Sequence, residues 1–145
     1  MSNAIAAANT YISRGDGASP ESFAAGEIAE VVSIGGPKPD SEEIDVTHLR
    51  SPSRTREYIQ SYLIPGEIPL VMNWIPSDAS QDEVTGIVAD YVSGTVKSYK
   101  ITYPDGSTDT FRAYVKNYDH PANTGDKLTL NATLRVTGAV TFVSA

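Results

Sequence analysis

Side chains that could serve as a general base or as a nucleophile are scarce, because the chain has two histidines, His48 and His120, and no cysteine. Histidine is the usual general base, and a thiolate nucleophile needs cysteine. His48 lies in an alternating polar and apolar run, which is typical of a half-buried strand, and His120 lies in the turn-like segment 119–123. No spacing of His, Asp and Glu marks a metal site. We therefore expect no catalytic residue, no cofactor and no metal ligand, and a protein that is not an enzyme.

The acidic residues form two clusters, at residues 42–45 and 82–83, that could provide paired carboxylates. Acid–base use of such a pair needs a desolvated partner, whereas carboxylates at this spacing occur on most solvated surfaces. The glycine pair at 35–36 does not lie between a strand and a helix, as the glycines of a phosphate-binding loop do. We interpret both clusters as solvated faces and the glycines as part of a turn.

The 145 residues include 18 acidic and 11 basic side chains, which gives a formal net charge of -7. This length fits one domain over residues 1–145 that is held together by packing alone, because there is no cysteine to form a disulfide. An acidic surface does not neutralise phosphates, so we expect no tight binding to nucleic acid. No window approaches the roughly 18 uninterrupted apolar residues of a membrane span, so we expect no membrane partner.

The first half of the chain predicts short strands separated by turns. Residues 1–25 are rich in small and polar side chains and predict a flexible N-terminal arm. Apolar residues alternate with polar ones in 26–34 and in 43–49, which predicts two strands. The segment 50–57 then holds three arginines and one proline, which is the composition of a solvated excursion.

The middle of the chain predicts a strand-like run followed by one helix. The strand-like run at 67–76 contains prolines, which favour an edge position or a bulge. A helix is expected between Ser80 and Gly94, where Ser80 and Glu83 form a possible capping box. The residues that we expect in the core are Trp74 and the apolar stripe of this helix, Val84, Ile87, Val88 and Tyr91.

The last third of the chain predicts a hairpin and two more strands. The turn residues 104–107 separate the strand-like runs 95–103 and 108–118. Two final strands are expected at 127–136 and 139–143, separated by a Thr-Gly pair. The chain is therefore expected to be mainly β, with one helix that packs on a sheet.

Two stretches of the sequence carry a recognisable pattern when they are taken together. They are residues 41–47, followed by the loop rich in serine and arginine and by 65–70, and the hairpin 99–115. In this order, and with the helix between them, they resemble the tail tube protein (major tail protein) family of long, non-contractile-tailed bacteriophages, particularly the lambda-like group. The likeness covers about residues 26–143.

The resemblance implies a β-sandwich or partial barrel with one flanking helix, the fold of phage tail tubes and of the type VI secretion tube. Its members are structural subunits whose hexameric rings stack head to tail into a hollow tube, through which DNA passes without specific binding. The implied partners are further copies of the chain, a tape-measure protein, the tail terminator and the baseplate or tail-tip proteins. Such subunits assemble in the cytoplasm of the bacterial host and belong to the tail of the virion.

The resemblance also implies two assembly segments, the flexible arm 1–25 and a long loop, 36–62, that reaches the adjacent ring. The basic residues of this assembly loop are Lys38, Arg50, Arg54 and Arg56. In an acidic chain, such a loop can dock on an acidic neighbour through charge-assisted contacts. We expect deletion of residues 38–56 to leave a folded monomer that cannot polymerise.

Two alternatives fit the same sequence. Eight of its aromatic residues are tyrosine, so a soluble β-sandwich module could use them to bind carbohydrate or another ligand. Such a module would be monomeric. A tail component of the same fold other than the major tube protein, such as a baseplate-proximal tube protein, is the second alternative.

Overall fold

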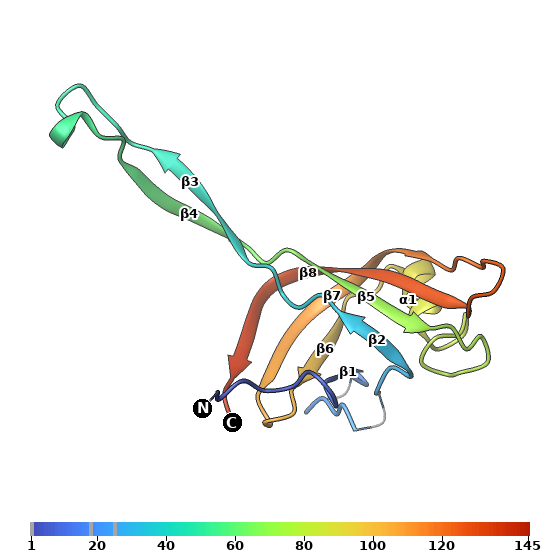
Figure 1. The fold of residues 1–145 in the computed structure, drawn as a ribbon. Helices are drawn as coiled ribbons and strands as arrows, with labels where there is room; N and C mark the ends of the chain where they lie inside the picture. The colour runs from blue at the N-terminus through green and yellow to red at the C-terminus, as the bar shows by residue number, and fades with distance from the viewer. Residues whose placement is uncertain (1, 18, 25) are drawn as a thin grey trace.

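The computed structural model describes residues 2–17, 19–24 and 26–145, which form eight strands, one α-helix and one 3-10 turn. The strands are β1 (Tyr11–Arg14), β2 (Val31–Ile34), β3 (Asp40–Asp45), β4 (Tyr58–Ile64), β5 (Glu67–Asn73), β6 (Lys97–Thr102), β7 (Thr108–Asp119) and β8 (Thr129–Val143). The helix α1 spans Ile87–Ser93, and the 3-10 turn η1 spans Pro52–Arg54. Figure 1 shows a curved sheet from which a long two-stranded hairpin projects.

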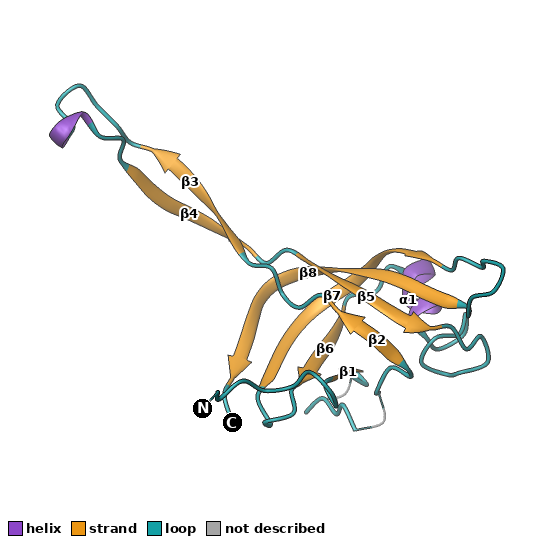
Figure 2. Cartoon of the chain, viewed as in Figure 1, coloured by secondary structure: helices purple, strands orange, loops and turns teal. Residues whose placement is uncertain are grey.

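Six strands form one antiparallel sheet in the order β1-β6-β7-β8-β5-β2, while β3 and β4 form a separate two-stranded sheet. The large sheet curls until its edges approach each other. The N–H of Arg14 in β1 donates to the carbonyl of Gly26 (2.8 Å), and the N–H of Ile28 donates to the carbonyl of Ile12 (3.0 Å). The result is a nearly closed barrel with one helix beside it (Figure 2), which confirms the predicted mainly β fold.

Alternate side chains of the long strands fill the interior of the barrel. In β5 and in most of β7 and β8 every second residue is buried, as expected for strands with one face towards a core. At its centre the rings of Tyr99 and Phe111 stack, with centroids 5.9 Å apart. The buried apolar residues are Ile12, Ile28, Ile68, Leu70, Met72, Ile87, Tyr99, Ile101, Phe111, Ala113, Val115, Leu130, Ala132, Leu134 and Val136.

The predicted flexible arm at residues 1–25 is wrong for Tyr11–Arg14, which form the edge strand β1. This strand pairs with β6, and Ile12 is completely buried opposite Ile101, so its side chain completes the apolar interior. Residues 1, 18 and 25 of the predicted arm lie outside the described residues.

The predicted strand at 26–34 is shorter in the structure, where only Val31–Ile34 pair as β2. Glu30 has a φ of 49°, in the left-handed region, and this interrupts the extended backbone. Ile28 is therefore buried while Val32 is 55% exposed, although uninterrupted alternation would place both on one face.

The helix is shorter than the predicted segment between Ser80 and Gly94, because it begins only at Ile87. Ser80 does not cap it. Instead, the Oγ of Ser80 donates to Oδ1 of Asp78 (2.5 Å) and accepts a hydrogen bond from the N–H of Ala29 (3.0 Å). The hydroxyl that the capping box required thus links this loop to the segment before β2.

The predicted core residues have different environments in the structure. Ile87 is completely buried, Trp74 is partly buried against the core, and Val88 is half-buried. The placement of Val84 and Tyr91 in the core is wrong, since they are 74% and 44% exposed. The chain is not yet helical at Val84, and Tyr91 lies on the outer side of a helix that is only two turns long.

The turn predicted at 104–107 joins β6 and β7, with Gly106 at a φ of 93°. The two final strands, predicted at 127–136 and 139–143, are instead the single strand β8. Its pairing with β7 continues across an irregularity in register, and Gly138 within it has a φ of 82°. A glycine that accommodates a bulge therefore replaces the predicted break.

A buried ion-pair network fastens the helix to the sheet. Asp90 of α1 is 2% exposed, and its carboxylate pairs with Arg14 of β1 (2.8 Å) and with Lys97 of β6 (2.9 Å). The hydroxyl of Tyr99 lies 3.5 Å from the same carboxylate. Burial, together with the negative charge of Asp90, raises the pKa of Tyr99. Loss of the carboxylate would leave two cations without their counter-charge.

Candidate assembly site

Strands β3 and β4 and the turn between them form a hairpin, residues 40–64, that stands away from the barrel (Figures 1 and 2). It contributes none of the buried core residues. Its large apolar residues that are 38% to 107% exposed are Ile44, Val46, Leu49, Tyr58, Ile59, Tyr62, Leu63 and Ile64. A hairpin of two strands is marginally stable alone in water, and an exposed apolar surface of this kind marks an interaction site.

The assembly loop predicted at 36–62 therefore contains a two-stranded ladder, whose register runs from Asp40 opposite Ile64 to Asp45 opposite Tyr58 with one shift between Ser41 and Glu43. The predicted solvated excursion at 50–57 lies in the turn between these strands, where most of its residues are exposed. The alternation of the sequence indicated a half-buried strand, but both of its faces are exposed because no second layer covers the hairpin.

The tip of the hairpin, residues 46–57, is ordered by its own hydrogen bonds. The Oγ of Ser51 donates to the carboxylate of Glu57 (2.6 Å) and accepts from the N–H of His48 (3.0 Å). Ser53 and Arg54 in η1 both have left-handed φ angles, of 54° and 53°. Because this turn is already formed, little conformational freedom is left to lose when the tip binds a partner.

The predicted basic residues lie at different positions along the hairpin and its base. Lys38 is exposed just before β3. Arg56 pairs with Asp45 at 3.1 Å, and hydrogen bonds from Thr47, followed by the charge of Arg56, lower the pKa of Asp45. Arg50 and Arg54 are exposed at the tip, and neither forms any of the ion pairs found among the described residues.

The two chain segments at the base of the hairpin lie against each other. Gly66 has a φ of 84°, and the carbonyl oxygen of Lys38 lies 2.5 Å from where a Cβ of Gly66 would stand. A side chain at Gly66 would therefore meet backbone. The same closeness means that the hairpin can be cut out and the chain rejoined without stretching the barrel.

The far end of the barrel, formed by loops 74–86 and 119–128, lies opposite the hairpin. The chain enters β5 from the hairpin at Glu67 and leaves it at Asn73, where the loop 74–86 begins (Figure 1). These two loops contain five carboxylates and one lysine. The hairpin tip carries three arginines and one glutamate, so the two ends of the molecule have opposite charge.

A small aromatic cleft with a volume of about 80 Å³ opens at the far end. Trp74 and His120 stack in it with ring centroids 4.5 Å apart, and the ring of Tyr118 lies 5.9 Å from that of His120. Asp82 and Glu83 line the same cleft. Neither carboxylate belongs to any of the ion pairs in the described ranges.

Hydrogen bonds hold the loop that carries these carboxylates in place. The amide of Gln81 is completely buried and donates to the carbonyls of Ala29 (2.9 Å) and Asn73 (3.0 Å). Oδ1 of Asp82 accepts a hydrogen bond from the N–H of Thr85 (2.7 Å), and this bond contributes most to lowering the pKa of Asp82. The carboxylate is therefore ionised at neutral pH and fixed in position.

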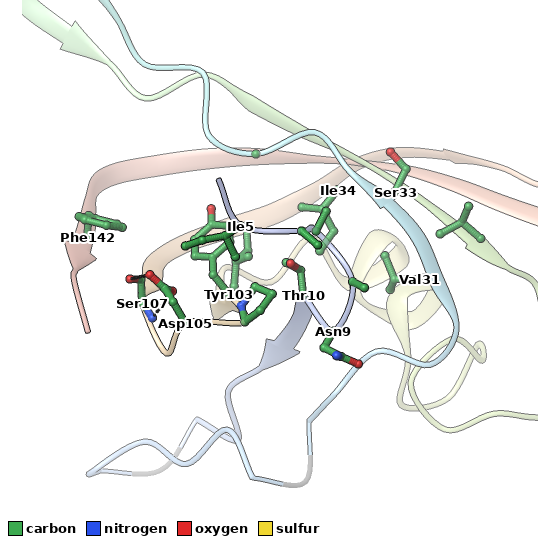
Figure 3. Close-up of a pocket in the computed structure, with 17 residues that line it drawn as sticks. Ile5, Asn9, Thr10, Val31, Ser33, Ile34, Tyr103, Asp105, Ser107 and Phe142 are labelled. Carbon is green, nitrogen blue, oxygen red and sulfur yellow. Dashed lines mark hydrogen bonds between the residues drawn. The ribbon is translucent and has the colours of Figure 1, made fainter. Parts of the chain in front are cut away.

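An open groove of about 790 Å³ lies near the chain termini, between the N-terminal segment, β2 and the turn after β6 (Figure 3). Asp105 is the one charged residue among those that line it, and its carboxylate already accepts two hydrogen bonds from Ser107, both of 2.9 Å. Tyr103 also lines the groove, and burial together with a hydrogen bond to Asp109 raises the pKa of Tyr103 to about 12. The groove offers apolar surface and few free polar groups.

Part of β8 has one edge without a strand partner in the described structure. Strand β5 pairs with β8 only from Thr129 to Arg135, whereas β7 pairs with it as far as Val143. The backbone N–H and C=O groups of residues 137–143 that face away from β7 are thus available to a strand from another chain.

The two histidines do not share a site. His48 lies at the tip, where its side chain is 63% exposed and 3.6 Å from Glu57, and His120 lies in the cleft at the far end. The interpretation of His48 as half-buried is therefore wrong. In the described parts of the chain no group of three or more His, Asp or Glu could hold a metal ion. No helix there is long and apolar enough to cross a membrane.

Sequence reasoning missed two features of the site. Leu49 is completely exposed at the tip, and the signal for it was an apolar residue immediately before the arginine-rich segment. The stack of Trp74 on His120 joins the end of β5 to the end of β7. It had no local signal, because these residues meet only when the sheet forms.

Comparisons with known proteins give one family and one fold. The lambda phage tail tube protein (TTP) family matches residues 9–143. A chain from the virion of a native gene transfer agent (GTA) particle has a TM-score of 0.73 at 18% identity, covering 97% of this chain and 100% of that chain. A chain from the tail of an empty GTA particle, refined with C6 symmetry, has a TM-score of 0.71 at 17% identity, with coverages of 92% and 96%. A chain from the sheath/tube terminator of PVC, an extracellular contractile injection system, has a TM-score of 0.71 at 14% identity, with coverages of 99% and 99%.

A search of curated proteins found no match. The family match includes the strands of the barrel, the helix and the hairpin, and the solved structures share this fold along almost the entire chain. The chain therefore belongs to the lambda phage tail tube protein family.

Proposed function

We propose that this chain is the structural subunit of the tail tube of a phage or phage-like particle, and that its hexameric rings stack head to tail into a hollow tube. The hairpin is the observation that carries this proposal. Its apolar residues have no cover among the described residues, and the two chain segments at its base lie against each other. The family match and the C6 symmetry of the similar GTA tail support six copies per ring.

The free edge of β8 could join neighbouring copies and so close the ring. Main-chain hydrogen bonds from residues 137–143 to a strand of the neighbouring copy would continue the sheet from subunit to subunit. An unpaired edge of this length is an aggregation risk in a monomer. Within a closed ring of identical copies the same edge becomes an interface.

Further partners follow from the family and from the charge of the chain. The solved structures of similar fold include tube terminator, baseplate and cap assemblies, so terminator and baseplate or tail-tip proteins are proposed to cap the two ends of the tube. A tape-measure protein within the lumen is proposed because the chain belongs to the tail tube family. The net charge of -7 favours a lumen that repels the DNA backbone and lets it pass without specific binding. We propose no catalytic role for any residue.

A ligand-binding module is the second candidate function, and the open groove is the observation that favours it. Its volume of about 790 Å³ is within the range of small-molecule sites. Such sites also need a few convergent polar groups, but the one carboxylate lining this groove is already satisfied by Ser107. The aromatic cleft, at about 80 Å³, is too small for a sugar ring. Both features favour surfaces that other copies cover on assembly.

Excision of the hairpin tests the proposed function. Residues 39–65 are replaced by a short glycine linker between Lys38 and Gly66, whose backbones lie against each other. The concentrated wild-type chain should form rings or tubes in negative-stain electron microscopy, and the excised variant should stay monomeric with an unchanged thermal unfolding transition. Tubes from the excised variant, or persistent monomers of the wild-type chain that bind a small ligand, would contradict the proposal.

A further inference from the structure

The hairpin leaves the barrel at the start of β5, and the aromatic cleft opens beyond the end of β5 (Figure 1). A head-to-tail stack would therefore bring the tip of one copy towards the far end of the next. We propose that the cleft formed by Trp74, Tyr118 and His120, with Asp82 and Glu83, receives an arginine from the hairpin tip of a second copy of this chain. The proposal rests on the proposed function, because it assigns the contact that joins successive rings.

The cleft has the chemistry of a guanidinium site. The ring faces of Trp74 and Tyr118 attract a cation through their π electrons, and the planar guanidinium stacks on such faces. Asp82 and Glu83 add negative charge at the same opening. The volume of about 80 Å³ is large enough to hold the few heavy atoms of a guanidinium group.

The tip supplies matching groups from a surface that is already ordered. Arg50 and Arg54 are exposed and have no ion-pair partner among the described residues, whereas Arg56 is held by Asp45. Leu49 stands beside them and is completely exposed. A charged pair that forms on docking is then surrounded by apolar contact, which excludes water and strengthens the pair.

The contact is heterologous, because the donor surface and the receptor surface are different parts of the same molecule. A heterologous contact that does not close on itself continues from copy to copy and produces an open stack. The groove near the termini is the competing receptor. It fits the tip less well, since Asp105 is its one charged lining residue, whereas two carboxylates line the cleft.

Disulfide trapping in the full chain tests this proposal, because the natural sequence contains no cysteine. The test variant carries Arg50→Cys and Glu83→Cys, which leaves Arg54 and Asp82 in place. The matched control carries Arg50→Cys and Asp105→Cys, which directs the same tip to the groove. Each chain then has one donor and one receptor cysteine, so oxidation of a correct stack links many chains into a ladder on a non-reducing gel.

The proposal expects a ladder from assembled tubes of the Glu83→Cys pair and none from the Asp105→Cys pair. Tubes without the Glu83→Cys ladder, or with a ladder from the control pair, would overturn the proposal and leave the tube function intact. Failure of the wild-type chain to form rings or tubes would overturn the proposed function and this contact with it.

The intrinsic fluorescence of the chain gives an independent readout, because Trp74 is its one tryptophan. Insertion of an arginine beside the indole should shift its emission and reduce its quenching by acrylamide when tubes form. The excised variant should show neither change at the same concentration. An unchanged Trp74 signal in wild-type tubes would contradict occupation of the cleft.

Discussion

Leu49→Ala should weaken tube assembly without affecting the folded monomer. Leu49 is 107% exposed, so its side chain makes no packing contribution within the chain and all of it is available for burial on assembly. The substitution removes three carbon atoms, and at about 0.8 kcal/mol per buried CH₂ the interface loses roughly 2 kcal/mol. Since about 1.4 kcal/mol corresponds to a tenfold change in affinity, the critical concentration for assembly should rise roughly 30-fold.

The assay is sedimentation of assembled tubes over a series of total concentrations, with the protein left in the supernatant giving the critical concentration. Leu49→Met is the matched control, because methionine has nearly the same apolar volume and should change the critical concentration little. The melting temperature of the monomer should be the same for all three proteins. An unchanged critical concentration for Leu49→Ala would refute the reasoning that the tip is buried by another copy.

Other predictions concern the barrel. Asp90→Asn should cost about 3 kcal/mol of unfolding free energy, because it leaves the buried Arg14 unpaired while the partly exposed Lys97 can turn to solvent, and the exposed control Asp45→Asn should leave thermal unfolding nearly unchanged. Ile87→Ala should cost about 2 to 5 kcal/mol in chemical denaturation, whereas Val84→Ala, at an exposed position, should be close to neutral. Hydrogen bonds from Ser80 lower the pKa of Asp78 below its ordinary value of 3.8, so its contribution to stability is complete above that pH and is lost as the pH falls through the lowered pKa. Denaturation at a series of pH values should therefore show stability falling below about pH 4 less steeply in Asp78→Asn than in the wild-type chain.

Much of the fold follows from local sequence patterns. The turn at 104–107 and the alternation on either side of it predicted the hairpin of β6 and β7, because turn residues and a period of two act over a few neighbouring positions. The mainly β character and the single helix were predicted for the same reason. The location of three arginines in the loop between β3 and β4 was also visible, since charge composition is read directly from the sequence.

The errors share a non-local cause. The sequence of Tyr11–Arg14 predicted a flexible arm. The segment is a strand because it pairs with the edge of β6 and because Ile12 is buried in the interior of the barrel. Ser80 looks like a helix cap, but its hydroxyl is used by Asp78 and Ala29, so the helix begins later.

The sequence alone determined which segments are extended, where the chain turns and which loop is basic, because these depend on short-range backbone preferences and on composition. The tertiary structure decided which strand faces are covered. An alternating strand such as β3 has the same sequence pattern whether or not a second layer lies against it, and here the hairpin leaves both faces open. It also brought Trp74, His120 and the carboxylates at 82–83 into one cleft, because residues far apart in the chain meet only when the sheet sets their positions.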